Sequence, residues 1–238
     1  MKLAIMQPYF FPYLGYFSLI KQSDKFIIFD TPQFMRKGWI ERNRVIKLSG
    51  GSVYVKVPLV KAPLSTLINE MMIDNSSQWK DKIFSQLDIY KKKAPYYKQV
   101  VSLVKECLTD EFNSISKLNE RILKYVCSYL GIETEIVVFS EMDIEVDSPD
   151  APDEWALNIC KSLGAKQYLN AAGGQSFFDV NKYNKNDIDL YFIEQPLYEY
   201  DQFGKDFEIG LSILDVMMFN SPEEIMDMLS QGSLIKAS

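Results

Sequence analysis

The chain has 238 residues, of which 47% are hydrophobic, 13% aromatic and 24% charged, and its formal net charge is -6. This composition is typical of a globular protein, and an acidic chain lacks the overall positive charge with which proteins bind DNA. Because the sequence contains no histidine, a Ser-His-Asp triad, a Cys-His pair and an imidazole base are all excluded. A general base must therefore be Asp, Glu, Lys, Tyr or a group of the substrate.

The cysteines and the hydropathy of the chain indicate a cytoplasmic protein. Cys107, Cys127 and Cys160 are odd in number, far apart and set among apolar residues, so we interpret them as reduced core residues. The N-terminus lacks a signal-peptide pattern, and no stretch approaches the ~20 apolar residues of a membrane span. Without histidine or a CxxC pair, we expect no metal site.

The first part of the chain shows strand and helix patterns that are typical of an α/β fold. Short apolar runs predict buried strands at residues 2–6 and 25–30, and apolar residues three and four apart predict a helix between them. Residues 42–60 alternate in polarity around Gly50 and Gly51, and this pattern predicts a β-hairpin.

The rest of the chain predicts three amphipathic helices followed by further strands and helices. The helices fall within residues 77–130, and later apolar runs predict strands at 135–140, 166–170 and 188–194, with helices near 153–165 and 222–229. We therefore predict a single α/β domain over residues 1–238. It would contain a Rossmann-like parallel or mixed sheet, the hairpin and a mainly helical insertion at about residues 75–130.

The segment QPYFFPYLGYF, residues 7–17, concentrates aromatic rings after the first predicted strand. Tyr9, Tyr13 and Tyr16 each combine a flat apolar face with a hydroxyl, which suits a sugar or a base. Gln7 adds an amide at the end of the strand, where it is a candidate for polarising a carbonyl. The alternative is a local hydrophobic cluster held by the two prolines.

A second candidate segment, FDTPQFMRKGWIERNR, is the most charged part of the first half of the chain. Arginine binds phosphate with a planar fork of donors, a tryptophan ring can stack on a base, and an amide between two arginines can orient a ligand. The alternative is an edge strand whose charges prevent pairing with another sheet. The substrate-binding residues predicted here are Gln33, Lys37, Trp39, Arg42, Asn43 and Arg44.

Loops after other predicted strands converge on the same edge, because ligands bind beyond the carboxyl ends of parallel strands. Asp30 ends a buried strand, and burial would raise the pKa of its carboxyl group, so it is the candidate general base. Asn170, Gly173 and Gly174 follow a later strand, where backbone N–H groups of a glycine loop could hold a phosphate or an oxyanion. A plain turn is the alternative.

The opening of the chain loosely resembles nucleotidyltransferases and pantothenate synthetases. Those enzymes carry an HxGH motif at the turn after the first strand, and Tyr13 and Tyr16 occupy the positions of its two histidines. The resemblance implies a Rossmann-like fold, and it implies an ATP-dependent amide ligase as one alternative activity.

A closer resemblance covers most of the chain. QPYFFPYLGYF, WIERNRVI, LGAKQYLNAAGG and LSILDVMMFN resemble the WbqC-like family in order and spacing. That resemblance implies a role in the biosynthesis of bacterial O-antigen or other surface polysaccharides, where some members are named glycine transferases. This chain departs from many members, which carry His at the position of Tyr9 and a basic residue near Glu154 and Trp155.

The resemblance and the residues together predict an N-acyltransferase that transfers an aminoacyl group, with glycyl as the candidate, to a nucleotide-linked amino-deoxy sugar. The acyl donor stays open between a thioester, an aminoacyl-tRNA and an acyl adenylate, so tRNA is retained as a partner and DNA is not. Homo-oligomerisation also stays open. The alternatives are a non-catalytic sugar-nucleotide binding or scaffold protein of the same pathway, and the amide ligase.

Overall fold

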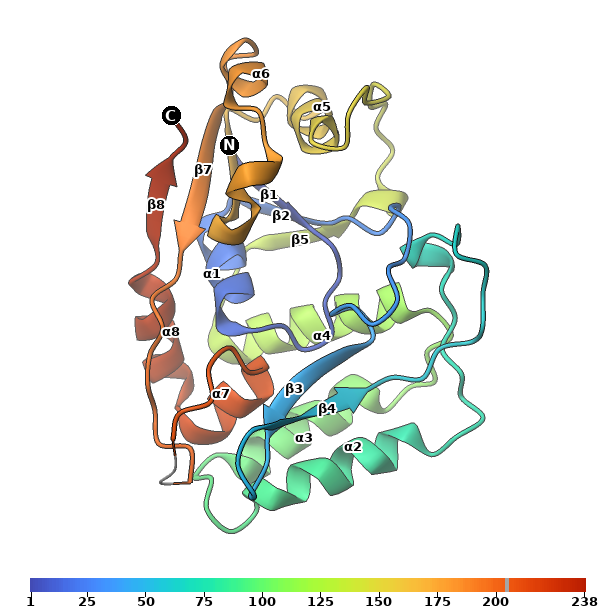
Figure 1. Cartoon of the computed structure of the whole chain (residues 1–238), viewed down its shortest axis with the longest axis vertical. Coiled ribbons are helices and arrows are strands. Elements are labelled where there is room, and N and C mark those ends of the chain that lie inside the picture. The colour runs from blue at the N-terminus through green and yellow to red at the C-terminus, as the bar shows by residue number, and fades with distance from the viewer. Residues whose placement is uncertain (204–205) are drawn as a thin grey trace.

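The computed structural model describes residues 1–203 and 206–238 and contains a six-stranded sheet flanked by helices (Figure 1). The strands lie in the order β5 (Glu135–Val138), β2 (Lys25–Ile28), β1 (Lys2–Met6), β6 (Gln167–Ala171), β7 (Asp189–Glu194) and β8 (Ser233–Lys236). The first five strands are parallel, and β8 is antiparallel to β7. The predicted α/β class with a parallel or mixed sheet is therefore confirmed.

Helices cover both faces of this sheet and fill the lower half of the molecule in Figure 1. The α-helices are α1 (Leu14–Gln22), α2 (Trp79–Leu87), α3 (Tyr97–Leu108), α4 (Ile115–Leu130), α5 (Glu154–Ser162), α6 (Val180–Asn184), α7 (Ile213–Phe219) and α8 (Pro222–Ser230). Short 3-10 helices are η1 (Ile68–Glu70), η2 (Asp88–Tyr90), η3 (Phe139–Glu141) and η4 (Ala172–Phe177).

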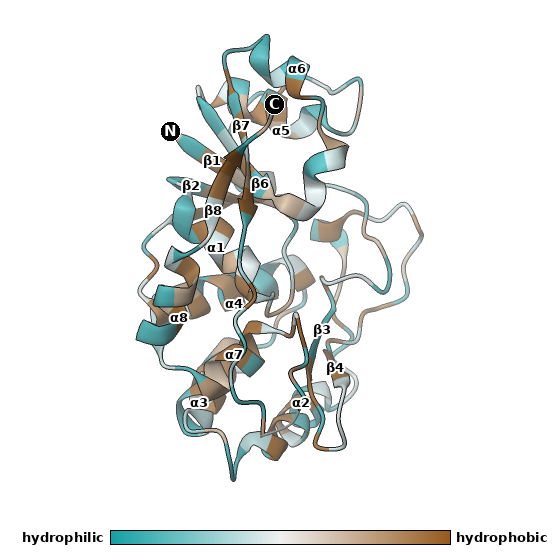
Figure 2. Cartoon of the chain, turned by 60° about the vertical axis from the view of Figure 1, so that its left-hand side comes forward, coloured by the Kyte–Doolittle hydropathy of each residue, from teal (hydrophilic) through white to brown (hydrophobic). Residues whose placement is uncertain are grey.

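Side chains of the parallel strands are buried on both faces, which explains their nearly continuous apolar sequences. Ala4 and Phe26 join the core that contains α1 and α4, whereas their neighbours Leu3 and Ile27 join the core that contains α5. Figure 2 shows the apolar residues concentrated in the strands at the centre of the upper half. The sheet is thus the shared wall of two apolar cores.

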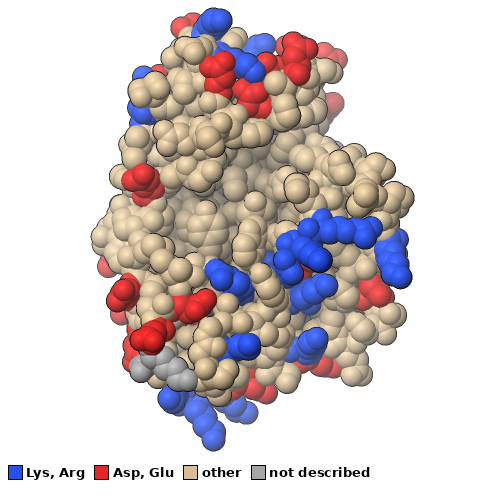
Figure 3. All heavy atoms as spheres, in the orientation of Figure 1, with Lys and Arg blue, Asp and Glu red and all other residues tan. Residues whose placement is uncertain are grey.

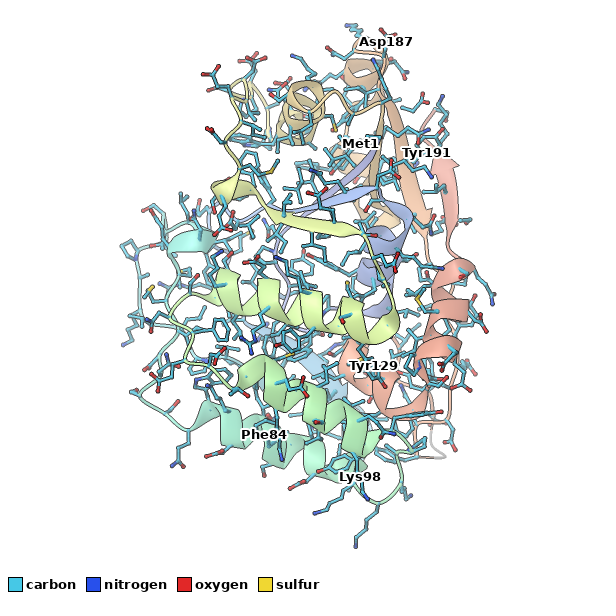
Figure 4. The ribbon with its side chains drawn as sticks, turned by 180° about the vertical axis from the view of Figure 1, so that it is seen from behind. Met1, Phe84, Lys98, Tyr129, Asp187 and Tyr191 are labelled. Carbon is cyan, nitrogen blue, oxygen red and sulfur yellow. The ribbon has the colours of Figure 1, made fainter. Side chains whose placement is uncertain are left out.

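The predicted hairpin is confirmed and lies in front of the helices. β3 (Arg42–Ile46) pairs in antiparallel fashion with β4 (Ser52–Lys56), and Gly50 and Gly51 supply backbone φ angles of 94° and 68° in the turn. Seen from behind, α4, α3 and α2 follow one another down the molecule (Figure 4). The division into one domain with a helical insertion stays a prediction.

Several elements differ from the sequence-based prediction. The glycine loop after β6 is the 3-10 helix η4, and α6, α7, β8 and the other short 3-10 helices were not predicted. α7 consists almost entirely of buried residues, so its sequence lacks the apolar and polar alternation that marks a surface helix. β8 is exposed along its whole length, so no apolar run marks it.

The cysteines are core residues, as predicted. Cys107, Cys127 and Cys160 are buried and form no disulfide. Burial raises the pKa of each thiol to about 12, so these side chains stay protonated and unreactive at neutral pH. Within residues 1–203 and 206–238, no helix is both long and apolar enough to cross a membrane.

One buried carboxylate joins the hairpin to the C-terminal part of the chain. Asp215, on α7, is fully buried and accepts hydrogen bonds from the hydroxyls of Tyr90 and Tyr200, the latter at 2.8 Å. The Gln202 amide also donates to it at 3.1 Å, and the Ile46 backbone N–H at 3.4 Å. Burial and the neighbouring carboxylate raise the pKa of Tyr90, so its hydroxyl keeps the proton that it donates.

Replacing Asp215 with Asn tests this network. An amide offers one acceptor oxygen, and its NH2 group would face donors, so at least one buried donor would lose its partner. We expect Asp215→Asn to lower the free energy of unfolding by about 1–3 kcal/mol, measured by urea denaturation. The exposed α8 variant Asp227→Asn is the control and should change stability by less than about 0.5 kcal/mol; equal effects of the two changes would contradict the role of the network.

Candidate functional site

The strand order reverses beside β1, and this reversal creates the candidate site. β2 and β5 extend the sheet on one side of β1, whereas β6 and β7 extend it on the other. In open parallel sheets, ligands bind beyond the carboxyl ends of the strands at such a reversal. Figure 3 shows a hollow in the middle of this face, with few charged groups inside it and Lys and Arg side chains below it.

The loop after β1 is held in place by polar side chains from three distant segments. The Asn43 amide donates to the carbonyl oxygens of Phe10 and Phe11, at 3.1 and 2.9 Å. The Asn119 amide, on α4, donates to the Pro8 carbonyl at 2.8 Å, and the Ser212 hydroxyl donates to the Phe11 carbonyl at 2.7 Å. Buried carbonyl groups need such partners, so these side chains define the path of the loop.

The aromatic residues of this loop divide into a buried set and an accessible set. Phe10 and Phe11 are fully buried, and Tyr16 is 1% exposed with its hydroxyl donating to the Gln7 carbonyl at 2.8 Å. Tyr16 therefore supports the loop from inside, and its predicted contact with a ligand stays a prediction. Tyr9 is only partly buried and packs 5.5 Å from the Tyr16 ring, so both sequence interpretations describe part of the loop.

Tyr9 and Tyr13 keep hydroxyls that a ligand can use. Tyr13 is 37% exposed, and neither hydroxyl is hydrogen-bonded within the described part of the chain. Burial raises the pKa of Tyr9, and burial followed by the neighbouring Tyr9 raises the pKa of Tyr13. Both side chains therefore remain protonated hydrogen-bond donors at neutral pH. The Gln7 side chain, half-buried at the end of β1, likewise has no hydrogen-bond partner among the described residues.

Strand alternation separates the three central residues of the charged segment. Asn43 faces the core and is 3% exposed. Its amide holds the aromatic loop in position, and its predicted contact with a ligand stays a prediction. Arg42 and Arg44 face outward. Arg42 lies over the Tyr54 ring at 4.2 Å and donates to the Lys37 carbonyl, and the Lys37 side chain has no partner in the described structure.

Arg44 and Trp39 lie next to Tyr13. The Arg44 guanidinium lies 6.0 Å from the centre of the Trp39 ring and donates a hydrogen bond to the Gly210 carbonyl at 3.3 Å. The backbone carbonyl of Arg44 accepts a hydrogen bond from the Ser212 N–H. Ser212 also forms a β-bridge with Tyr13. A cavity of about 70 Å³ opens beside Tyr13 and reaches the loop after β7. The fold therefore brings the aromatic loop and part of the basic segment together.

Asp30 follows β2, as predicted, but its carboxylate is already hydrogen-bonded. It is 2% exposed and accepts from the Ser140 hydroxyl at 2.8 Å, the Ser140 N–H at 3.1 Å and the Ser116 hydroxyl at 3.1 Å. Ser116 lies in the first turn of α4, whose positive end also stabilises an anion. The Ser140 and Ser116 hydroxyls both donate to the same oxygen of Asp30, so a serine hydroxyl is in place to relay a proton to it.

Asn170 lies within β6, whereas the sequence placed it in the loop after the strand, and its side chain serves the fold. Asn170 is 9% exposed, donates to the Tyr168 hydroxyl at 2.7 Å and accepts from the Ala171 N–H at 2.8 Å. A Cβ on Gly174 would lie 2.9 Å from the Asn170 side-chain oxygen, so a larger residue there would displace the Asn170 amide. Gly173 faces open space and remains accessible.

Three polar residues at the site were not predicted from the sequence: Asn119, Ser212 and Glu41. Asn119 and Ser212 hold the aromatic loop from positions more than 100 residues away, at separations of 111 and 201 residues. Glu41 is a buried carboxylate with an unpartnered oxygen beside a second cavity. The side chain of the predicted Gln33 donates to the Leu64 carbonyl at 2.6 Å. The only sequence signal for Glu41 was an acid within a basic segment.

Replacing Asn43 tests the anchoring of the loop. Asn43→Ala leaves the buried Phe10 carbonyl without a donor and leaves the Phe11 carbonyl with only the Ser212 hydroxyl, so we expect a loss of about 1–3 kcal/mol in the free energy of unfolding. The change should also expose the aromatic loop to limited proteolysis. Asn181→Ala, at an exposed position on α6, is the control. Unchanged stability and protease resistance in Asn43→Ala would show that the loop does not depend on this amide.

Comparisons with known proteins show similarity to one family along nearly the whole chain. The WbqC-like protein family matches residues 7–227. "Uncharacterized protein Rv1507c" of Mycobacterium tuberculosis (strain ATCC 25618 / H37Rv) is 32% identical over 231 residues, which cover 96% of this chain and 97% of that protein. No solved structure matches the chain. From the first loop to the last helix, this chain belongs to the WbqC-like protein family.

Proposed function

We propose that this protein is a cytoplasmic N-acyltransferase, aminoacyl and specifically glycyl, that acts on a nucleotide-linked amino-deoxy sugar in surface polysaccharide (O-antigen) biosynthesis. The observation that carries the proposal is the anchored aromatic loop at the strand reversal. Its Tyr9 and Tyr13 side chains combine an apolar ring with an unused hydroxyl, and Tyr13 lines a cavity of about 70 Å³. Sugars are bound through such faces and donors.

The charged groups below the hollow support a phosphorylated substrate. Lys37 forms no ion pair with a carboxylate in the described part of the chain, and Arg44 forms only a long one, at 3.8 Å from Glu208. Both side chains therefore keep hydrogen-bond donors for a phosphate. Arg42 lies on the same outward face of β3 as Arg44. We propose that these three residues hold the diphosphate while Trp39, 40% exposed, stacks against the nucleotide-sugar.

The proposed reaction forms an amide bond. The amine nitrogen of the sugar attacks the acyl carbonyl carbon, the bond from that carbon to the carrier breaks, and the carrier leaves with the electron pair. The amine proton passes to the Ser140 hydroxyl, whose own proton passes to Asp30 over their 2.8 Å hydrogen bond. The Gln7 amide or the N–H of Gly173 stabilises the negative oxygen of the intermediate.

A second candidate is a sugar-nucleotide binding protein without catalytic activity. The three hydrogen bonds that Asp30 already accepts favour this alternative, because such a carboxylate also serves as a structural link between the end of β2, η3 and α4. Both candidates require the nucleotide-sugar to bind. They differ in whether product appears.

A binding panel followed by a turnover assay tests the proposal. A ligand at ~100 times its dissociation constant adds about 2.7 kcal/mol to stability, which a thermal melt detects. Nucleotide-linked amino sugars should raise the melting temperature, and mass spectrometry should detect their glycyl amides once an activated glycyl donor is added. Binding without product for thioester, aminoacyl-tRNA and adenylate donors would support the non-catalytic protein. Pyrophosphate release that depends on glycine would support the amide ligase.

Two substitutions test the proton path. Asp30→Asn and Ser140→Ala each interrupt it, so we expect turnover to fall by about a hundredfold to ten-thousandfold with ligand affinity nearly unchanged. Circular dichroism and the binding assay show whether each variant is folded. Ser148→Ala, in the exposed loop before α5, is the control. Full turnover in both variants would remove Asp30 from the mechanism.

A further inference from the structure

A second cavity lies on the outer side of the charged segment and carries a distinctive polar group. It has a volume of about 250 Å³, and Phe34, Leu59 and Met71 are among the apolar side chains of its wall. Glu41 also lines it, although this side chain is only 6% exposed. One carboxylate oxygen of Glu41 accepts the Lys37 N–H at 2.8 Å, whereas the other, Oε2, is buried and has no hydrogen-bond partner.

An unpartnered carboxylate oxygen requires a donor, because a carboxylate only accepts hydrogen bonds and a buried acceptor without a donor is unfavourable. The neighbouring cations do not provide it. Arg36, Lys37, Lys56 and Lys61 line the same cavity, but none of them forms an ion pair with a carboxylate in the described part of the chain. Arg36 instead donates to the Ala62 carbonyl at 2.6 Å.

The cavity thus offers three features to a ligand: apolar walls, an acceptor that needs a donor, and a cationic rim. A nucleoside phosphate matches all three, with its base between the walls and its phosphates on the rim at Lys37, the residue that this rim shares with the proposed diphosphate site. Guanine presents two adjacent N–H donors on one edge. Uracil and thymine present one N–H between two carbonyl oxygens, which a carboxylate repels. Adenine and cytosine present an amino group beside a ring acceptor.

The geometry points to this cavity as a site for a guanine nucleotide, read by Glu41. The inference deepens the proposed function, on which its biological meaning rests, by naming a GDP-linked sugar as substrate. The segment with Lys37 and Glu41 also contacts the aromatic loop, because the Trp39 carbonyl accepts the Phe10 N–H at 2.8 Å. The Ile40 carbonyl accepts from Asn119, which also holds Pro8. One segment therefore borders both the nucleotide cavity and the sugar site.

Isothermal titration calorimetry of the full chain with GDP, ADP, CDP, UDP and dTDP tests this inference without any turnover. We expect GDP to bind at least about tenfold more tightly than UDP or dTDP, because only the donor edge satisfies the buried oxygen. Glu41→Gln keeps the size of the side chain and an acceptor for the Lys37 N–H. Its NH2 group would oppose the guanine donors, so GDP affinity should fall at least about tenfold and the preference over UDP should disappear.

Rim variants separate base recognition from phosphate binding. Lys61→Ala should weaken the binding of all five nucleotides by similar factors, because Lys61 belongs to the cationic rim. Lys98 is an exposed lysine on α3 (Figure 4), and Lys98→Ala should leave the binding of all five nucleotides unchanged. Equal affinity for GDP and UDP, or GDP binding that is insensitive to Glu41→Gln in a folded protein, would overturn the inference. Tightest binding of ADP or CDP would overturn the choice of guanine. GDP binding without acyl transfer would uphold this site and reject only the proposed enzyme.

Discussion

The rest of the site depends on the hydrogen bonds that hold the loop after β1. Two side-chain amides, Asn43 and Asn119, and one hydroxyl, Ser212, satisfy buried carbonyls of this loop. A loop that turns its carbonyls toward the core is stable only with such partners. Because the partners come from β3, α4 and the start of α7, the loop also joins the sheet to the hairpin and to the helices below it.

This anchoring explains how so many rings can lie in one connection. Phe10 and Phe11 fill the core on the side of α1 and α4, and Tyr16 supports them with its hydroxyl bound inside. Tyr9 and Tyr13, which stay partly accessible, are then held on this buried base. A binding face of this kind loses little conformational freedom when a ligand arrives, because the loop is already ordered.

The side chains around β3 separate buried polar groups from outward-facing cations. Alternation along the strand places Asn43 inward and Arg42 and Arg44 outward, while Glu41 is buried just before the strand with one oxygen unused. In a chain with a net charge of -6, this local group of cations stands out below the hollow (Figure 3). A focused positive rim attracts an anionic substrate even where the whole molecule is acidic.

The sequence by itself determined the α/β class, the hairpin and the position of nearly every strand and helix, because apolar periodicity and paired glycines act locally. It also predicted that the loop after β1 and the segment around Arg42 would share a site. Only the tertiary structure decided which side chains are free to contact a ligand. Tyr16 and Asn43 form buried hydrogen bonds within the protein, and Asp30 accepts hydrogen bonds from two serines of distant segments. Hydrogen bonds across 86 to 201 residues have no periodic signature, so Asn119, Ser212 and the unpartnered oxygen of Glu41 became visible only when the chain was folded.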